Sequence, residues 1–349
     1  MKRKLSILIC CMMLFTAICG GCSNPNASVS KSGFYFDTII KITLYGTNSE
    51  QYIDDCFEFA HKYENLFSNT IDSSEVSQIN SNAGSGSYVT VSDETLELIK
   101  EGILYGDVSN GAFDITIGKL SDLWDFSDIA ENLTSEDNET DASVLPSDAD
   151  IQSDLAHVNY KNIVIDGNQV MLTDPDSELD LGGIAKGYIA DRMKEYLNSK
   201  GITSGIINLG GNVLTIGEKS TGAAYKVGIQ KPFAKDGTSI ATVDVKDKSV
   251  VSSGVYERYY KIDGKLYHHI LDPKTGYPCD NNLYEVTIIS DRSVDGDGLS
   301  TTCFALGLDA GMQLIESMPD TEAIFITDDY QIHTSSGIGK DIPFTELSE

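Results

Sequence analysis

The chain has 349 residues, of which 41% are hydrophobic, so it is long enough to bury a large core. Its 53 acidic and 25 basic residues give a formal net charge of −28, which argues against a nucleic-acid-binding protein, because such binding requires a basic surface. The same charge disfavours direct adhesion to anionic lipid headgroups.

Residues 1–21 are typical of a secretory signal peptide. Three basic residues precede the apolar run Leu5 to Ala17, which is shorter than the roughly 20 residues that a helix needs to cross a membrane. Two glycines then precede Cys22, an order that resembles a bacterial lipobox, although Cys19 stands where Leu is usual. The sequence therefore predicts an exported protein that a lipid on Cys22 holds at the cell membrane, facing outside the cytoplasm. An ordinary secreted chain with an incidental cysteine is the alternative.

The first half of the mature chain predicts a tether, strands, helices and an insert. Residues 22–32 are the lipidated cysteine and a polar, flexible tether. Phe34–Tyr45 is rich in β-forming residues, whereas Gln51–Phe67 and Ser92–Tyr105 have helical periodicity. Residues 127–145 are acidic and lack an apolar period, which predicts a solvated surface insert.

The second half alternates short strands with helices. Helical patterns occur at Ser147–Ala156, Ile184–Ser199, Gly298–Ala305 and Ala310–Ser317. Strand patterns occur at Ile163–Ile165, Gln169–Leu172, Gly205–Leu209, Tyr225–Gln230, Ile240–Val245, Val250–Ser253 and Glu285–Ser290. Several connections are short enough for hairpins, so the pattern predicts an α+β fold with mixed, largely antiparallel sheets flanked by helices. One domain over residues 33–345 accounts for it.

A glycine-rich segment surrounds a lysine at the start of one predicted helix. Residues 180–192 read DLGGIAKGYIADR, with Lys186 between glycines. Backbone amides at a helix start favour anions, and a lysine adds a charged donor for phosphate. The segment is neither a Walker motif nor a Rossmann fingerprint. A tight turn with a solvated lysine explains it equally well.

A histidine lies where a predicted hairpin runs into a rigid loop. Alternation from Tyr256 to His269 around Asp263-Gly264 predicts the hairpin. Histidine is suited to proton transfer near neutral pH, so His269 is a candidate base. His268 is predicted to be its outward-facing neighbour, with no special role.

Two oxygen-bearing side chains share a face of another predicted helix. Asp297 and Thr301 are four residues apart, and together they offer hard oxygen ligands that suit Mg²⁺. A helix-capping Asp followed by a helical Thr is the simpler explanation on spacing alone. Asp114, after a Gly-Ala-Phe turn, could accept hydrogen bonds from a ribose or base, or simply cap that turn.

Taken in order, six segments of the chain resemble the ApbE family of FAD:protein FMN transferases. They are GAFDITIG, LDLGGIAKGYIADR, NLGGN, SSGVYERYY, YHHILDPKTGYP and DGLSTTCFALG, and the resemblance spans about Phe36 to Gly307. It implies an ApbE-like fold with an FAD cleft between lobes. It also implies an exported enzyme that splits FAD with Mg²⁺, releases AMP, and attaches FMN to a Ser or Thr of a target flavoprotein.

The resemblance also implies roles for individual residues. The metal ligands would be Asp297, Thr301 and the backbone carbonyl of Ala185, and His269 would be the base. Positions that would contact FAD are Phe36, Ala112, Phe113, Asp114, Asp180, Lys186 and Ile270.

Two positions depart from the family pattern. Thr70 stands where many transferases carry a Tyr near FAD, and variation there accompanies members that hydrolyse FAD. Ser300 stands where some members have a second acidic metal ligand. An FAD pyrophosphatase that gives FMN and AMP is therefore one alternative, and a non-catalytic flavin-binding lipoprotein is another.

Overall fold

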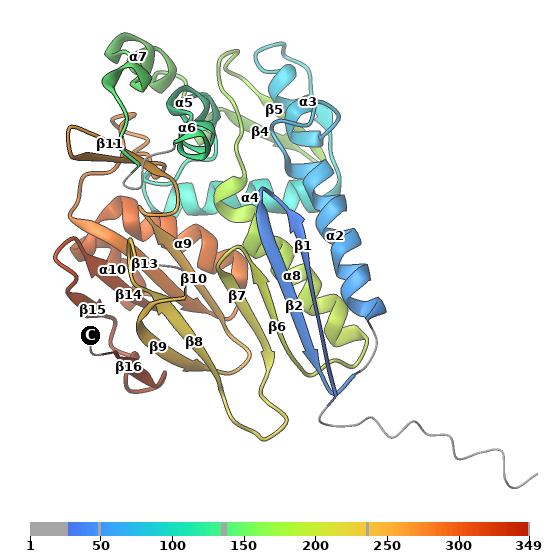
Figure 1. Cartoon of the computed structure of the whole chain (residues 1–349). Helices are drawn as coiled ribbons and strands as arrows, with labels where there is room; N and C mark the ends of the chain where they lie inside the picture. The colour runs from blue at the N-terminus through green and yellow to red at the C-terminus, as the bar shows by residue number, and fades with distance from the viewer. Residues whose placement is uncertain (1–26, 48–49, 134–137, 235–236, 348–349) are drawn as a thin grey trace, which may run out of the picture.

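A large antiparallel sheet forms the centre of the computed structural model, which describes residues 27–47, 50–133, 138–234 and 237–347 (Figure 1). Within these residues its strands are, in spatial order, β1 (Ser28–Tyr35), β2 (Thr38–Tyr45), β6 (Ser204–Leu209), β7 (Asn212–Gly217), β10 (Ser249–Gly254), β13 (Leu283–Ser290), β14 (Glu322–Thr327) and β15 (Ile332–Thr334). Each neighbouring pair is antiparallel. The α+β fold with largely antiparallel sheets is thus confirmed.

Helices cover one face of this sheet. They are α2 (Gln51–Phe67), α8 (Gly182–Ser199), α9 (Ser293–Leu306) and α10 (Leu308–Glu316), and α4 (Asp93–Val108) packs outside α8 and α9. The strands turn their fully buried side chains, such as Ile40, Ile42 and Ile288, toward these helices. The predicted start of α4 is correct, because the Ser92 side chain accepts the Thr95 backbone N–H as its N-cap.

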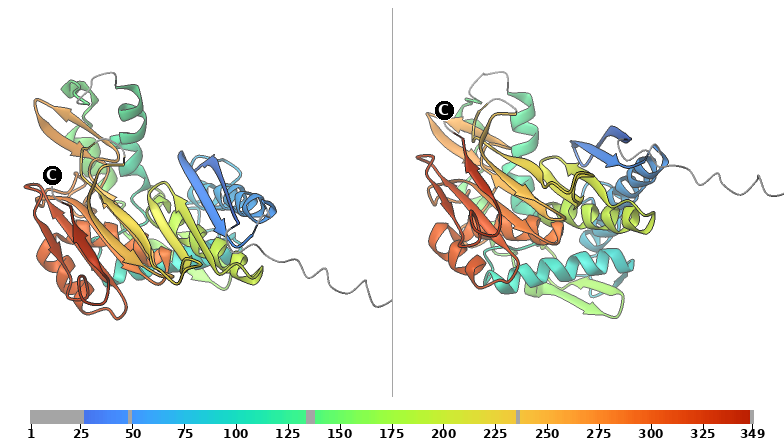
Figure 2. Two further views of the ribbon diagram at one scale, coloured as in Figure 1. Left: turned by 60° about the horizontal axis from the view of Figure 1, so that its bottom comes forward. Right: turned by 90° about the horizontal axis from the view of Figure 1, so that it is seen from below.

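A smaller sheet covers part of the opposite face (Figure 2). It consists of β8 (Tyr225–Gln230), β9 (Ser239–Val245) and β16 (Phe344–Glu346). Its apolar side chains pack on Val250, Ile289 and Ile324 of the large sheet. Toward β1 and β2 the large sheet stays open on this side, and there Phe34 and Ile39 are exposed.

A group of short elements sits above the upper end of the sheet in Figure 1. It contains α5 (Gly118–Trp124), α6 (Phe126–Asn132), α7 (Asp148–Leu155) and the hairpin β11 (Tyr259–Ile262) and β12 (Lys265–His268). A separate core of stacked rings, centred on Trp124, Phe126 and Tyr260, holds it together. The remaining short elements are α3 (Glu75–Ser81), β3 (Val89–Thr90), β4 (Ile163–Asp166), β5 (Gln169–Leu172), η1 (Ala142–Val144) and η2 (Tyr160–Asn162).

Two boundaries differ from the sequence prediction. The predicted insert, residues 127–145, is not purely solvated, because α6 lies in it and Ile129, Val144 and Leu145 pack against the ring core. The predicted tether also ends earlier than residue 32, because β1 starts at Ser28 and pairs with β2 along its whole length.

The predicted signal peptide and Cys22 lie outside the described residues. Within the described ones, no helix is both long enough and apolar enough to span a membrane. Cys56, Cys279 and Cys303 are free thiols, and Cys56 and Cys303 are buried.

Candidate active site

The crossing of α8 and α9 fixes the centre of the candidate site. Gly187 lets the helices approach closely, since a Cβ there would lie 2.3 Å from the carbonyl oxygen of Ser293. Each helix also accepts backbone hydrogen bonds from the other. Asp191 of α8 accepts the N–H groups of Ser293 and Val294, and Asp297 of α9 accepts that of Gly187.

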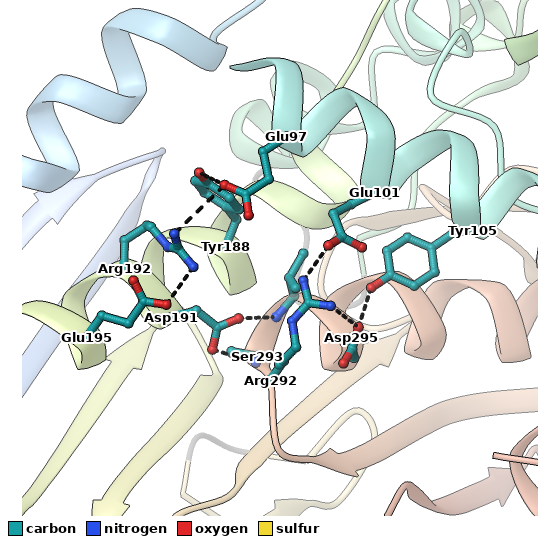
Figure 3. A network of polar contacts seen from close by, with 11 residues as sticks. Glu97, Glu101, Tyr105, Tyr188, Asp191, Arg192, Glu195, Arg292, Ser293 and Asp295 are labelled. Atoms are coloured by element: carbon teal, nitrogen blue, oxygen red, sulfur yellow. Dashed lines mark hydrogen bonds and ion pairs between the residues drawn. The ribbon is translucent and has the colours of Figure 1, made fainter. Parts of the chain in front are cut away.

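A polar network behind the crossing locks α9 against α4 and α8 (Figure 3). Arg292 pairs with Glu101 of α4 and, at 3.5 Å, with Asp295. The hydroxyl of Tyr105, also from α4, donates to Asp295 at 2.7 Å, and its ring lies against the backbone of Gly298. The network holds the first turn of α9, which directly precedes Asp297.

Asp297 is a buried carboxylate in the second turn of α9. Its Oδ2 accepts from Gly187 N at 2.5 Å, and its Oδ1 accepts from the side-chain amide of Asn212 at 3.0 Å. Burial raises the pKa of Asp297, and the nearby Lys186 charge opposes that rise. The helix begins at Ser293, four residues earlier, so the capping explanation for Asp297 is wrong.

Hydroxyl groups line the next turn of α9. Thr301 Oγ1 lies 3.1 Å from Ser253 Oγ at the end of β10, and Ser253 also contacts Ser300 Oγ at 2.8 Å. Ala185, whose carbonyl the resemblance implies as a ligand, lies two residues before Gly187 on the helix that crosses Asp297. The donors are one carboxylate, a hydroxyl and a carbonyl. Such hard oxygens fit Mg²⁺, and a buried carboxylate favours a bound cation.

The two adjacent histidines have exchanged their predicted environments. His268 is the buried one: its Nδ1 accepts the Ile270 N–H, its Nε2 donates to the carbonyl of Cys279, and its ring packs edge-on against Phe304. Burial lowers the pKa of His268 to about 4. The prediction that His268 faces outward was wrong, because β12 turns it into the core at the end of α9.

His269 is partly exposed, and its ring is available for proton transfer. Its Nδ1 lies 3.3 Å from the Arg258 carbonyl, a contact that assigns the proton to Nδ1 and leaves Nε2 as an acceptor. Desolvation first, and then the charge of Arg258, lower the pKa of His269 well below its ordinary value. The imidazole is therefore neutral near pH 7, as a base requires.

Lys186 connects these groups electrostatically. Burial raises the pKa of Asp297 and of Glu257 and lowers that of His269, and the charge of Lys186 acts on all three, although α9, the loop before β11 and the end of β12 supply them. Lys186 stands in the second turn of α8, on a helix whose glycines leave the first turn bare. The structure thus favours the anion-binding explanation of the glycine-rich segment over a solvated lysine.

The predicted adenosine-side loop reaches the start of α8 through Phe113. The ring of Phe113 would lie 3.3 Å from a Cβ at Gly183, and both Ala112 and Phe113 are buried. Asp180 accepts the Gly182 N–H at 2.7 Å and so shapes the entry to the helix. Asp114 accepts from Thr116 N, Thr116 Oγ1 and Tyr160 N, which favours its turn-capping role over ligand contact.

Three remaining predicted positions lie in different surroundings. Phe36 and Asp37 form the turn between β1 and β2, with φ of 53° and 54°, and a bulky residue in this left-handed region is strained. Thr70 is exposed in the loop after α2 and contacts Ser68 Oγ. Ile270 is buried and its backbone is bonded to His268 and Cys279, so its side chain belongs to the core.

Another cluster with metal-ligating groups lies elsewhere. Within the described residues, His157, Asp174 and Asp176 bring ligand atoms within 4.8 Å of one another. His157 Nδ1 already lies 2.9 Å from Asp174, and Lys119 pairs with Asp176 at 2.8 Å. The positive charge that this cluster attracts is therefore supplied by the protein itself.

Residue-by-residue reasoning missed several contributors to the site. Asn212, Ser253 and Glu257 were not singled out, although they stand in the quoted segments NLGGN and SSGVYERYY. Asn212 follows the Gly210-Gly211 turn, both of whose glycines have positive φ, and this turn brings the amide to Asp297. The two adjacent glycines indicated a tight turn, and this turn positions the Asn212 side chain that contacts Asp297.

Comparison with known proteins places this fold among flavin transferases. The ApbE protein of Thermotoga maritima superposes with a TM-score of 0.78 at 31% identity, over 89% of this chain and 97% of that one. The flavin transferase ApbE of Vibrio cholerae gives 0.77 at 28% identity, over 89% and 98%.

The sequence comparisons agree with the structural ones. A relative from Klebsiella pneumoniae (strain 342), named FAD:protein FMN transferase, is 38% identical over 90% of this chain and 93% of its own length. The model of the ApbE family matches residues 36–325. The chain belongs to the ApbE family, which confirms the resemblance found in the six segments.

Proposed function

We propose that this protein is a Mg²⁺-dependent FAD:protein FMN transferase. It cleaves FAD, attaches FMN by a phosphoester bond to a Thr or Ser of an extracytoplasmic flavoprotein, and releases AMP. The names of the relatives support flavin transfer by an enzyme. The observation that carries the proposal is the geometry at the crossing of α8 and α9. The buried Asp297 carboxylate is held there by Gly187 and Asn212, Lys186 stands directly before Gly187, and Thr301 lies one turn further along α9.

The phosphate end of the reaction falls to α8 and α9. Lys186 would bind the pyrophosphate oxygens beside the bare first turn of α8. Asp297, Thr301 Oγ1 and the Ala185 carbonyl would hold Mg²⁺, which when bound neutralises charge that develops on the pyrophosphate. Asn212 and Gly187 keep the Asp297 carboxylate in one orientation through their two hydrogen bonds.

The acceptor end of the reaction falls to His269. Its Nε2 would take the proton of the Thr or Ser hydroxyl, because a hydroxyl is a weak nucleophile without a base. The freed oxygen attacks the phosphorus of the FMN half, the bond to the AMP phosphate breaks, and AMP leaves. The Arg258 carbonyl fixes the ring and its tautomer at the other nitrogen.

The lipid on Cys22 would keep the enzyme beside its membrane-bound targets. Five residues separate Cys22 from Ser28, where β1 begins. A chain of that length reaches about 20 Å at most, so the anchor would hold the domain close to the bilayer. If a Cys22→Ala protein still fractionates with membranes, the anchor is wrong.

One incubation tests the activity. The mature chain is mixed with FAD, Mg²⁺ and an acceptor domain bearing the target Thr, and both AMP and the mass of the acceptor are measured. An acceptor heavier by one FMN residue, with equimolar AMP, is the expected result. Free FMN without adduct would indicate an FAD pyrophosphatase, in line with Thr70, and no cleavage would indicate a flavin-binding lipoprotein.

A further inference from the structure

The tip of the β1–β2 hairpin carries an apolar pair that the fold does not use. Phe34 and Ile39 are the most exposed large apolar side chains of the described residues, at 68% and 67%. They are direct cross-strand partners, so they form one patch. The next pairs on this face are polar: Ser32 opposes Lys41. The patch is therefore confined to the tip.

The tip that carries these apolar side chains also has a strained backbone. Its two-residue turn needs positive φ at both positions, which Asn-Gly adopts readily, yet here Phe36 and Asp37 occupy it. The Glu64 side chain of α2 holds the turn by accepting the Phe36 N–H at 3.0 Å. A strained turn that a second element holds in place is typical of a functional position.

The patch adjoins the candidate active site. The Gly210 N–H donates to the carbonyl of Ile39 at 3.3 Å, and Gly210 lies directly against Thr38. Two residues further along, Asn212 holds the Asp297 carboxylate. The exposed pair is thus hydrogen-bonded to the turn that precedes Asn212, and the Asn212 side chain reaches Asp297 on the helix-covered side of the sheet.

The bilayer is a poor occupant for this patch. The tether joins the hairpin at its other end, where Gly46 N–H donates to the Ala27 carbonyl. Ser28 and Phe34 are six residue steps, about 20 Å, apart along β1, and Figure 1 shows the tip pointing to the opposite end of the sheet. The chain's net charge of −28 also disfavours approach to anionic lipid.

We propose that Phe34 and Ile39 are the docking surface for the acceptor protein, and that they bind apolar side chains flanking its target Thr or Ser. This inference rests on the proposed transferase function. A second polypeptide must reach the phosphates of bound FAD, and an apolar pair on the neighbouring hairpin can hold that polypeptide without contacting the phosphates. Interface energy commonly concentrates in a few such side chains.

The test compares Phe34→Thr/Ile39→Thr with Leu104→Gln in the mature domain. Threonine retains β propensity, and Leu104, 50% exposed on α4, is a matched loss of exposed apolar surface elsewhere. The probe is an acceptor domain that the wild-type protein flavinylates. We expect the KM for the acceptor to rise about tenfold in the double variant only, with the Kd for FAD and the rate at saturating acceptor within about twofold.

Several outcomes would overturn the docking surface. An unchanged acceptor KM rejects it, a raised Kd for FAD makes the pair part of the flavin site, and lost binding to phosphatidylglycerol vesicles makes it a membrane contact. If thermal melting shows that the double variant does not fold, Ile39→Thr alone is measured in the same way. A wild-type protein that cleaves FAD but modifies no acceptor rejects the transferase function itself.

Discussion

Two carboxylates at one helix crossing, the partly buried Asp191 and the buried Asp297, have very different surroundings. Asp191 accepts two backbone N–H groups at the start of α9 and lies in a network in which Arg292, Asp295 and Tyr105 are paired with one another (Figure 3). Asp297 has one backbone and one amide donor, and its electrostatic partner is Lys186, which also acts on cleft residues. Asp191, whose partners belong to packed helices, stabilises the fold. Asp297, whose electrostatic partner Lys186 also acts on other candidate site residues, can serve a ligand.

The largest expected effect comes from a substitution of Asp297 in the candidate active site. Asp297→Asn removes the only carboxylate of the proposed ligand set, so FAD cleavage should fall about 10²–10³-fold. The free energy of unfolding should change by no more than about 1–2 kcal/mol, because the loss of a desolvated charge offsets the loss of one N–H acceptor. AMP release and thermal melting measure the two quantities. Retained cleavage would place Asp297 outside the site, and a large loss of stability would make it a structural residue like Asp191.

His269→Gln tests the proposed catalytic base of the candidate active site. Transfer to the acceptor should slow about 100-fold, while the Kd for FAD changes by less than about twofold. The lowered pKa of His269 also predicts that the wild-type transfer rate is flat between pH 7 and pH 6, because the imidazole is already unprotonated there. Adduct mass against time gives the rates. A wild-type rate that falls about threefold over that range would show an ordinary histidine pKa of about 6.5.

The fold was largely predictable because periodicity and capping act locally. Gln51–Phe67 is α2 to the residue, and Ser92 and Ser147 cap helices that their patterns predicted. What the sequence missed depends on contacts over long distances. The first turn of α9 is not apparent from local pattern, since its N–H groups are capped by Asp191, about 100 residues earlier.

The candidate site was predictable in its residue types but not in its packing. Spacing alone favoured a helix cap for Asp297, and only the crossing with Gly187 shows otherwise. Alternation along a hairpin says that neighbours face opposite sides, yet it does not say which of His268 and His269 faces the core. The Phe304 ring, supplied by another element, decides that.

The same comparison applies to His268 and His269 at the end of the β11–β12 hairpin. The pH dependence of stability tests whether His268 is buried and hydrogen-bonded at both ring nitrogens. Its folded pKa of about 4 lies below the unfolded value of 6.5, so the unfolded state binds the proton first as pH falls. The stability from neutral His268 is complete above pH 6.5 and is lost on acidification, by about 2 kcal/mol between pH 7 and pH 5. His268→Gln should remove that slope in urea titrations. An identical slope in both proteins would show that the ring is solvated.

The smallest effect on FAD cleavage should come from Asp191, which lies in the polar network at the crossing of α8 and α9. Asp191→Ala removes the acceptor of two N–H groups at the start of α9, and a lost cap costs about 1–2 kcal/mol. The melting temperature should fall by a few degrees, and FAD cleavage by less than about tenfold, because Gly187 and Asn212 still hold Asp297. Arg192→Lys is the matched control, since Arg192 bonds Glu195 on the same helix without touching α9. If Asp191→Ala abolished cleavage in a protein that still melts cooperatively, Asp191 would be needed for cleavage as Asp297 is. The distinction between a structural carboxylate, Asp191, and an active-site carboxylate, Asp297, would then be wrong.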